Sequence, residues 1–389
     1  MRVSRILGGC VPLAASLLLV AAAGAANGHA NYRAVCPAAI LGSARCHAQV
    51  VTDARANPHS TISPTGYGPG QFQTAYSLPS AIAGAGQTIA VVDAYDDPNA
   101  ESDLALYSST YGLPACTTAN GCFSKVNQTG GTRYPRVDQG WALEISLDVQ
   151  IAHASCPNCK ILLVEAKTNS FSNLLAAEDY ATAHASVVSD SWGGSEFSTE
   201  TSSSFDGHFN RPGIPITVSS GDSGYGVEYP AASQYVTAVG GTTLNLNPDS
   251  TRVSETAWSG AGSGCSAYEP KPSWQTDAGC AKRAVSDVSA DADPNTGASV
   301  YDSYGYQGQK GWFQVGGTSL AAPLVASVYA LAGNGSSTTY GSYPYAQSSS
   351  LYDVTSGSNG SCGRGYLCTA GPGYDGPTGL GTPNGTGGF

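Results

Sequence analysis

Between residues 87 and 219, short runs of consecutive apolar residues alternate with longer segments of helical periodicity. Apolar runs this continuous predict strands that are covered on both sides rather than exposed on one. Strands that alternate with helices in this way are typical of a parallel α/β sheet. The predicted strands are 87–93, 160–165, 187–189 and 214–219, and the predicted helices are 98–112, 138–155 and 171–185.

The remaining segments lie before and after this series in the sequence. A last helix is predicted at 318–333, directly after a pair of glycines. Residues 31–66 are expected to be an irregular N-terminal arm or propiece, 235–315 has more strand and turn signals, and the Gly/Ser/Thr-rich tail 334–389 is expected to be loop-like. Since no Pro- or Ser-rich linker interrupts the series, residues 67–389 are predicted to form one domain.

The charge balance excludes several classes of partner. The chain has 17 Lys and Arg against 28 Asp and Glu, a formal net charge of -11, and only 12% charged residues. Nucleic-acid binding requires a basic surface, and an anionic membrane surface attracts a polybasic segment. Neither feature is present, so binding to nucleic acid or to a membrane surface is not expected.

The N-terminus has the layout of a secretory signal peptide. Two arginines precede an apolar run from Val11 to Ala23, and small residues follow. This pattern predicts a leader over residues 1–26, with cleavage after Ala26 or Ala30 and a secreted mature chain. An uncleaved anchor is the alternative, although the run is short for a helix that crosses a bilayer.

Ten cysteines remain when Cys10 in the leader is set aside. An even number in an exported chain predicts five disulfides, and neighbour pairing is the simplest arrangement, although sequence does not prove it. The C-x-x-C motif at Cys156 and Cys159 has two alternatives, a redox pair or half of a zinc site, but no second C-x-x-C completes a zinc site. The neighbouring pairs are Cys36/Cys46, Cys116/Cys122, Cys156/Cys159, Cys265/Cys280 and Cys362/Cys368.

A candidate nucleophile lies in the segment Gly-Gly-Thr-Ser-Leu-Ala-Ala-Pro, residues 316–323. The two glycines allow a sharp loop and the close approach of another backbone. Ser319 is therefore expected at a helix N-terminus, where unpaired N–H groups and the helix dipole favour negative charge. The alternative is an ordinary helix-capping serine.

A candidate acid pair lies in the predicted helix 138–155. Glu144 and Asp148 are four residues apart and therefore share one face of the helix. Two carboxylates this close repel each other, so one pKa should rise and a proton can be shared between them. The alternative is a solvated acidic face, but the apolar residues around the pair favour burial.

These segments together resemble the sedolisins, the serine-carboxyl peptidases, which have a subtilisin-like fold and a Ser-Glu-Asp triad. The resemblance extends from about Tyr67 to Pro383 and depends on many ordered segments. Besides the two above, they are Val-Ser-Asp-Ser-Trp-Gly (188–193), Ser-Ser-Gly-Asp-Ser-Gly (219–224), Tyr-Val-Thr-Ala-Val-Gly-Gly-Thr (235–242), Asp-Val-Ser-Ala-Asp-Ala-Asp-Pro (287–294) and Gly-Pro-Gly-Tyr-Asp (371–375).

The resemblance implies a role for each matching residue. Ser319 corresponds to the nucleophile, Glu144 to the general base and acid, Asp148 to the residue that orients Glu144, and Asp222 to the oxyanion-hole aspartate. Without the resemblance, Asp222 would be interpreted as a turn residue that caps its own backbone. Asp93 is expected to be accessory or structural. A carboxylate base still accepts a proton near pH 4, where an imidazole is already protonated, so the implied triad suits acid.

The tail resembles the calcium site of the same family. Asp353 and Asp375 would supply carboxylates, and Val354, Gly371 and Gly373 would supply backbone carbonyls, with water completing the six to eight oxygens that Ca²⁺ requires. The alternative is a pair of Asx turns in a glycine-rich tail. One structural calcium ion is therefore expected.

The sequence departs from the family pattern in two places. Sedolisins usually have a large folded propeptide, whereas here only residues 31–66 separate the leader from the recognisable domain. The segment Gly-Gly-Thr-Ser replaces the commoner Ser-Gly-Thr-Ser, which should matter little because Gly316 supplies no catalytic side chain in either form.

The resulting prediction is a secreted, monomeric serine endopeptidase that acts on proteins or peptides in acid through an acyl-enzyme. One alternative is a tripeptidyl-peptidase of the same family. The other is a secreted scaffold or binding protein that keeps the fold without catalysis, although all four catalytic positions carry competent residues.

Overall fold

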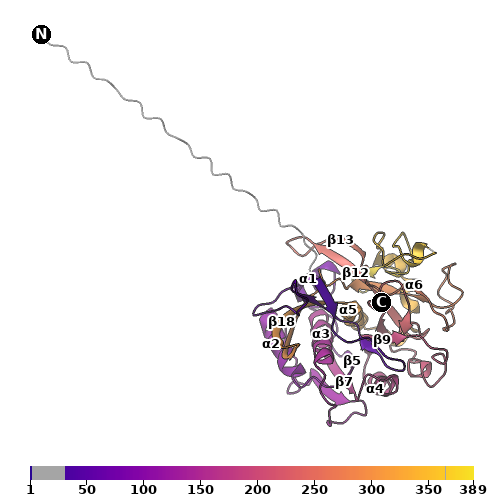
Figure 1. The fold of residues 1–389 in the computed structure, drawn as a ribbon, viewed down its shortest axis with the longest axis horizontal. Helices are drawn as coiled ribbons and strands as arrows, with labels where there is room; N and C mark the ends of the chain where they lie inside the picture. Colours follow the sequence, from indigo (N-terminus) through magenta and orange to yellow (C-terminus); the bar gives the residue numbers. More distant parts are fainter. Residues whose placement is uncertain (2–30, 364) are drawn as a thin grey trace.

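A mostly parallel sheet forms the centre of the molecule (Figure 1). The computed structural model describes Met1, residues 31–363 and residues 365–389. The strand order is β13-β12-β10-β8-β5-β7-β6 with β16 beside β12, and each pair of neighbours is parallel except β12 and β13. The strands are β5 (Thr88–Ala94), β6 (Phe123–Asn127), β7 (Lys160–Ala166), β8 (Val187–Asp190), β10 (Ile216–Ser219), β12 (Thr237–Leu246), β13 (Arg252–Ala257) and β16 (Val288–Asp291).

Helices flank this sheet, as the alternating pattern predicted. Two central helices, α3 and α5, pack against each other and against the sheet, while α4 packs on β5 and β7. This arrangement confirms the predicted α/β class, and the helices and strands predicted between 87 and 219 all form within a few residues of the expected positions. The helices are α1 (Pro69–Ala75), α2 (Ala100–Tyr111), α3 (Gln139–Ser155), α4 (Phe171–His184), α5 (Thr318–Ala332) and α6 (Ser342–Ala346).

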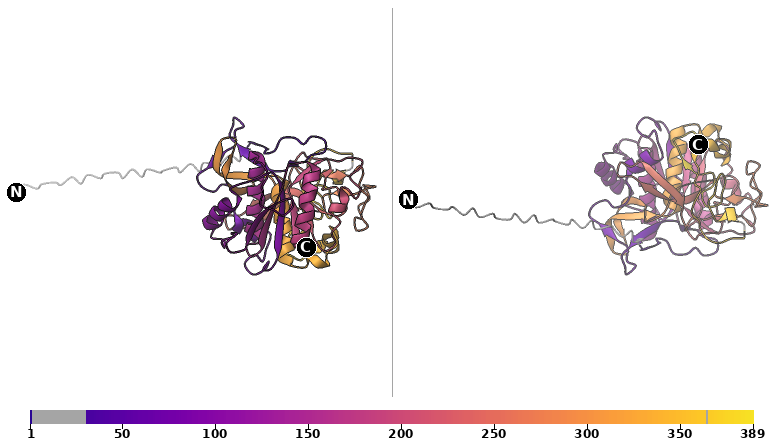
Figure 2. Two further views of the ribbon diagram at one scale, coloured as in Figure 1. Left: turned by 90° about the horizontal axis from the view of Figure 1, so that it is seen from below. Right: turned by 90° about the horizontal axis from the view of Figure 1, so that it is seen from above.

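The N-terminal arm is not irregular, which corrects the expectation from sequence. It contains four short strands, and these join two further sheets, with orders β1-β3-β18-β17 (β4 also pairs with β18) and β11-β9-β2. Figure 2 shows the indigo arm beside the orange strand β18. The strands are β1 (Asn31–Ala34), β2 (Arg45–Cys46), β3 (Gln49–Thr52), β4 (Ser60–Thr61), β9 (Trp192–Ser195), β11 (Glu228–Tyr229), β17 (Ala298–Tyr306) and β18 (Gln309–Gly316).

Two small ladders complete the described strands: β14 (Gly264–Cys265) with β15 (Ala284–Val285), and β19 (Leu351–Tyr352) with β20 (Thr382–Pro383). The C-terminal part of the chain is loop-rich, as predicted. It also contains short 3₁₀ turns at Gly335–Ser337, Ser348–Ser350 and Gly365–Leu367, and another lies earlier at Asp206–His208.

All five neighbour disulfides that the cysteine spacing suggested are present. The Cys156–Cys159 bridge follows the last residue of α3, so the C-x-x-C motif is a local staple, and Gly84 packs against its sulfur atoms. Cys10 and the predicted leader lie outside the described residues. Among the residues that are described, no helix is both long and apolar enough to span a bilayer.

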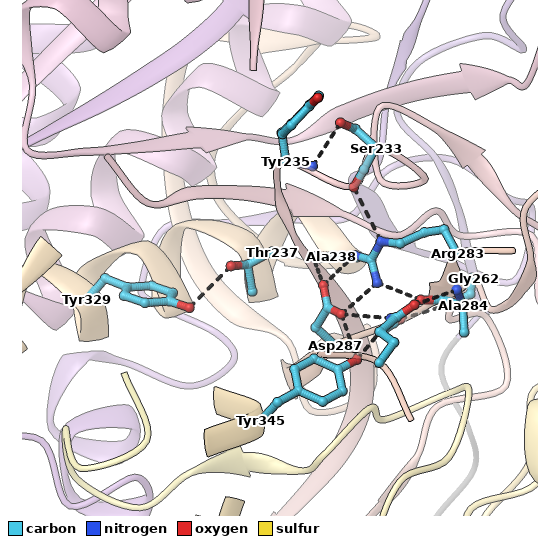
Figure 3. A network of polar contacts seen from close by, with 12 residues as sticks. Ser233, Tyr235, Thr237, Ala238, Gly262, Arg283, Ala284, Asp287, Tyr329 and Tyr345 are labelled. Atoms are coloured by element: carbon cyan, nitrogen blue, oxygen red, sulfur yellow. Dashed lines mark hydrogen bonds and ion pairs between the residues drawn. The ribbon is translucent and has the colours of Figure 1, made fainter. Parts of the chain in front are cut away.

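A buried ion pair joins the sheet to the C-terminal part of the chain (Figure 3). The Arg283 guanidinium contacts both carboxylate oxygens of Asp287, at 2.7 Å and 2.5 Å, and both side chains are almost completely buried. Asp287 also accepts hydrogen bonds from the Ala238 N–H of β12 and from the Tyr345 hydroxyl of α6, each at 2.8 Å. The partners satisfy the buried charges, which fixes β12 next to the loop region that follows α5.

Candidate active site

The acid pair on α3 is buried. Asp138 caps the helix by accepting hydrogen bonds from the N–H groups of Gly140 and Trp141, and the helix then runs through the interior with all its residues from Gly140 to Ser155 buried. Glu144 and Asp148 are both 0% exposed, which excludes the solvated acidic face. None of their carboxylate oxygens has a hydrogen bond of standard geometry within the described structure.

Burial and mutual repulsion act on this pair in the same direction. Burial raises the pKa of Glu144 well above its usual value, and the nearby carboxyls of Asp148 and Asp93 raise it further. The pKa of Asp148 is raised in the same way, by burial first and then by Asp93. Because a desolvated carboxylate is costly and three of them repel, the cluster retains protons that free carboxyls would have lost.

Two more buried carboxyls lie at the carboxyl ends of neighbouring strands. Asp93 is the sixth residue of β5 and burial raises its pKa to about 8, while Asp190 ends β8 and has a pKa raised well above normal by burial and by Glu178. The Trp192 indole donates to the Val92 carbonyl at 3.0 Å, so this tryptophan lies next to the strand residue that precedes Asp93. Asp190 was not predicted as a site residue, although it ends a buried strand and Asp93 lies at the end of one in the same way.

Ser319 is the second residue of α5 and is fully buried. The helix begins after Gly317, whose φ of 96° is disfavoured for other residues. The Ser319 hydroxyl donates to the Ser191 carbonyl at 3.3 Å, and its presence lowers the pKa of Glu144. Ser191 likewise lowers the pKa of Asp148. The structure therefore brings the predicted nucleophile close to Glu144, although the two are 175 positions apart in the sequence.

Asp222 reaches the same helix terminus from the loop that follows β10. Its Oδ1 accepts hydrogen bonds from the Thr318 N–H at 2.8 Å and from the Thr318 hydroxyl at 2.9 Å. Its Oδ2 accepts a hydrogen bond from the Gln49 side-chain amide at 3.1 Å. Burial raises the pKa of Asp222, and the partners only partly offset that shift. Asp222 therefore caps α5 beside Ser319, in contrast to the alternative of a turn residue that caps its own loop.

One histidine, His47, lies near Ser319, but its ring does not face the Ser319 hydroxyl. The Ser319 N–H points at the carbonyl oxygen of His47, 3.4 Å away. The His47 ring faces elsewhere, with Nδ1 2.6 Å from the Ser219 hydroxyl and Nε2 2.9 Å from a Glu228 oxygen. The His47 ring is therefore not placed to take a proton from the Ser319 hydroxyl, which donates to the Ser191 carbonyl. Sequence offered no signal for the position of His47, since the arm was expected to be irregular.

The packing around position 316 explains why a glycine is found there. A Cβ added there would lie 2.5 Å from the Ala292 carbonyl oxygen and 2.6 Å from the Pro294 nitrogen. Backbone atoms cannot move as a flexible side chain can, so the segment at 292–294 leaves no room for a larger residue. The glycine in place of serine is therefore matched to its surroundings in this chain.

The two predicted metal-binding carboxyls both lie against the loop 371–373 of the tail. Asp375 is buried and accepts from the Gly371 N–H at 3.0 Å, and Asp353 accepts from the Gly373 N–H at 2.9 Å. Burial and the negative charge of Asp353 help to raise the pKa of Asp375 to about 7. Two carboxylates that crowd one loop, with oxygen donors only, fit a hard cation such as Ca²⁺.

The buried acids predict that the fold is more stable in acid. Burial raises the pKa of Asp93 and Glu178 to about 8 and that of Glu165 to about 9. Above pH 4 the unfolded chain releases these protons while the folded chain keeps them, so stability falls as pH rises toward these values, by up to about 1.4 kcal/mol per pH unit for each group. We expect a higher unfolding temperature at pH 4 than at pH 7.5, measured on the Ser319→Ala variant to avoid self-digestion.

A matched substitution checks the cause of this pH dependence. Glu178→Gln removes one buried group that must stay protonated, and it should therefore flatten the decline between pH 4 and pH 7.5. Asp249→Asn, at an exposed turn, should leave the decline unchanged because the Asp249 carboxyl is fully exposed. Equal or greater stability at pH 7.5 than at pH 4 would contradict the prediction.

Comparisons with known proteins show which family this chain resembles. The subtilase family (Peptidase S8) matches residues 143–339. Kumamolisin from Bacillus sp. (strain MN-32) is 32% identical over 372 residues, and sedolisin from Pseudomonas sp. (strain 101) is 30% identical over 363 residues. These alignments cover 84% and 82% of this chain, which spans only 63% and 60% of the two relatives.

A solved structure extends the likeness to the fold. Pseudomonas sedolisin, described as a serine-carboxyl proteinase complexed with two molecules of pseudo-iodotyrostatin, superposes with a TM-score of 0.71 at 31% identity. The match covers 83% of this chain and 96% of that one. The subtilisin-like fold predicted from the sequence motifs is thereby confirmed.

Proposed function

The chain belongs to the sedolisin family of subtilisin-like serine peptidases, and from this premise we propose that it is a secreted serine-carboxyl endopeptidase that cleaves proteins in acid. The observation that carries the proposal is the proximity of Ser319, at the N-terminus of α5, to Glu144 of α3, which forms a buried pair with Asp148. A hydroxyl beside a carboxylate is an activated nucleophile, and the coupled pair needs to release only one of its protons to supply that carboxylate.

The chemistry follows from these positions. Ser319 Oγ attacks the carbonyl carbon of the scissile bond while Glu144 takes its proton, and Asp148 shares that proton with Glu144. Protonated Asp222 and the Ser319 N–H then donate to the developing oxyanion. Glu144 returns the proton to the leaving amine, and water hydrolyses the acyl-enzyme by the same steps in reverse order. The role of Asp222 suits acid, because Asp222 donates only when it is protonated.

The test is the hydrolysis of a denatured protein at pH 3–5 by the wild type and by the Ser319→Ala variant. We expect cleavage by the wild type alone, with little turnover at neutral pH. N-terminally blocked peptides separate the endopeptidase, which cuts them, from a tripeptidyl-peptidase, which does not. Equal activity in wild type and variant would rule out the proposed mechanism.

We also propose that the tail binds one structural calcium ion through Asp353, Asp375 and the carbonyls of Val354, Gly371 and Gly373. When bound, the ion would offset the repulsion between the two carboxylates that raises the pKa of Asp375. It would fix the tail, in which β19 and β20 pair with each other.

Calcium is expected to stabilise the protein against heat. Calcium at a hundredfold excess over its Kd should add about 2.7 kcal/mol to the free energy of unfolding. The measurement is thermal unfolding of the Ser319→Ala variant at pH 6, with calcium and with a chelator. Asp375→Asn should abolish the difference, while Asp249→Asn should preserve it. Identical melting curves with calcium and with chelator would contradict the calcium site.

Secretion is part of the proposal. The leader predicted over residues 1–26 supports it, as do the five disulfides, which form and persist in oxidising compartments.

A further inference from the structure

A cavity with several positive charges lies beyond the carboxyl end of β7. Its volume is about 560 Å³, and the side chains that line it include Arg133, Arg136 and Lys167. These are three of only 17 Lys and Arg in a chain with a net charge of -11. All three side chains are exposed, and none of them forms an ion pair with any carboxylate that the structure describes.

Two carboxyl groups near this end of the sheet are already matched by another cation. Lys125 of β6 places its Nζ 2.6 Å from an Asp96 oxygen and 3.5 Å from a Glu165 oxygen. Glu165 is also 0% exposed, so it does not face the cavity from the surface. The three cations of the cavity therefore keep their charge available, and their combined field attracts anions.

The loop that forms the cavity is fixed by its own hydrogen bonds. The Asn127 side-chain oxygen accepts from the Gly131 N–H at 3.0 Å, and the Asn127 amide donates to the Arg133 carbonyl at 3.0 Å. The Gln128 side-chain oxygen accepts from the Lys167 N–H at 2.6 Å, which ties the loop after β6 to the loop after β7. A site that is already formed loses less conformational freedom when a ligand binds.

An aromatic side chain connects the cavity to the candidate active site. The Arg136 guanidinium lies over the Tyr95 ring, 5.1 Å from its centroid, and the Tyr95 hydroxyl donates to the Asn169 side chain at 2.9 Å. Tyr95 directly follows β5, the strand that contains Asp93 of the buried acid cluster. Arg136 is therefore held in place by a residue that borders the active site.

The cavity and the candidate active site share one edge of the sheet. The strand order here is β8-β5-β7-β6, and these strands are parallel. Asp93 and Asp190 lie at the carboxyl ends of β5 and β8, while Lys167 and Gln128 directly follow β7 and β6. Ligands of parallel α/β sheets bind outside the carboxyl ends of the strands, so one elongated ligand can reach both places.

The N-terminal arm gives the length of chain between the two places. The Ala44 N–H donates to the Asn169 carbonyl at 2.8 Å, and the Asn169 amide donates to the Ala44 carbonyl at 2.7 Å. Asn169 is two residues beyond Lys167, and three residues after Ala44 the His47 carbonyl lies 3.4 Å from the Ser319 N–H. An extended chain advances about 3.3 Å per residue, so about 10 Å of chain joins the border of the cavity to the nucleophile.

We propose that this cavity binds acidic side chains of the protein substrate, at the fourth to sixth residues before the cleaved bond. The inference rests on the proposed peptidase function. A substrate that follows the path of the arm, in place of the arm, brings these residues to Arg133, Arg136 and Lys167. The three cations stay charged throughout the acid range, and glutamate, with a usual pKa of about 4.3, is mostly ionised at pH 5. Because this contact is remote from the reacting bond and persists in the transition state, it lowers KM and leaves kcat unchanged.

Three N-terminally blocked peptides test the site at pH 5. They share one core that the wild type cuts at a single bond, and they carry three Glu, three Gln or three Lys at the fourth to sixth positions before that bond. We expect KM to be about 5- to 20-fold lower for the Glu peptide than for the Gln peptide, and highest for the Lys peptide, because each exposed ion pair contributes a factor of about 1.5–5. The difference should shrink in about 0.5 M NaCl, which screens exposed charges.

Two matched variants locate the effect. Lys167→Glu reverses one charge in the cavity, and Lys160→Glu makes the same change at the other end of the same strand, where Lys160 is the exposed first residue of β7. Lys167→Glu should reduce the preference for the Glu peptide by about 3- to 10-fold, whereas Lys160→Glu should leave it unchanged. Thermal unfolding of both variants verifies that they are folded.

The same measurements separate this inference from the proposed function. Cleavage of the Glu and Gln peptides with equal KM by the wild type would overturn the inference and leave the peptidase function standing. A preference for the Glu peptide that Lys167→Glu does not change would also overturn it, because acidic residues would then be recognised elsewhere. Failure of the wild type to cut any of the peptides would overturn both.

Discussion

Replacing Glu144 with glutamine is expected to lower kcat by about 10²–10⁴-fold, because the variant keeps the shape of the side chain but has no group that accepts the Ser319 proton. Glu144 is 0% exposed and is the carboxyl whose pKa the Ser319 hydroxyl lowers. The comparison of kcat for wild type and variant on a blocked peptide, from pH 3 to pH 6, measures the effect.

The pH profile carries a second part of this prediction. Burial and the charge of Asp148 raise the pKa of Glu144, so the ionised form that acts as a base decreases as pH falls. The acid limb of the wild-type profile should therefore report the shared titration of Glu144 and Asp148. This limb should be absent from the residual activity of Glu144→Gln, because that variant lacks the base whose protonation the limb reports.

A matched control separates loss of the base from damage to the fold. Glu269 is also 0% exposed, with a pKa raised to about 9 by burial and by Asp206 and Glu200. Glu269→Gln should therefore keep kcat within a few-fold of the wild type. The unfolding temperature of Glu144→Gln at neutral pH should not fall, since the substitution removes a buried acid that is costly to ionise. A Glu144→Gln variant with wild-type kcat would exclude Glu144 as the base.

The regular elements around the site were predictable because their signals are local. The predicted helix 138–155 and strand 160–165 match α3 (Gln139–Ser155) and β7 (Lys160–Ala166) closely. Both are enclosed in the interior, so nearly every position is apolar or small, and short apolar runs bounded by turns mark them clearly. That Glu144 and Asp148 share one face of the helix likewise follows from their four-residue spacing and helix geometry alone.

The arm was not predictable, because its structure depends on distant partners. Strand β2 contains two residues, Arg45–Cys46, and pairs with β9 from a part of the chain about 147 residues later. Strand β3 pairs with β18, which is more than 250 residues away. Neither length nor alternation distinguishes such strands from loop, and nothing local shows which sheet edge will accept them.

The position of Asp222 shows what the family resemblance added to the interpretation of the residues alone. From the residues alone, an aspartate between glycine and serine is best explained as a turn residue. Its actual partners, Thr318 and Gln49, lie 96 and 173 residues away. That arrangement depends on the tertiary structure, so only the match to a known motif could suggest it from the sequence.

Replacing Asp222 with alanine is expected to lower kcat by about 10²–10³-fold. The asparagine variant should keep most of the activity that the alanine variant loses. Alanine removes the hydrogen-bond donor beside Ser319, whereas the asparagine amide donates without a proton from solvent. Burial raises the pKa of Asp222, so the wild-type donor persists above the usual range of an aspartate and is lost as pH rises through the raised value. The measurement is kcat against pH for the three proteins.

The alkaline limb of that profile decides whether Asp222 acts through its proton. In the wild type, activity should fall on the alkaline side as Asp222 ionises, since an ionised carboxylate repels the developing oxyanion. In Asp222→Asn that fall should move to higher pH, because the amide does not titrate and ionisation of Glu144 only favours the base. Both variants lose the carboxyl group that caps α5, so a shared drop in unfolding temperature would be structural and would not shift the limb. An unchanged alkaline limb in Asp222→Asn would mean that another group titrates there and that Asp222 serves only as the cap of α5.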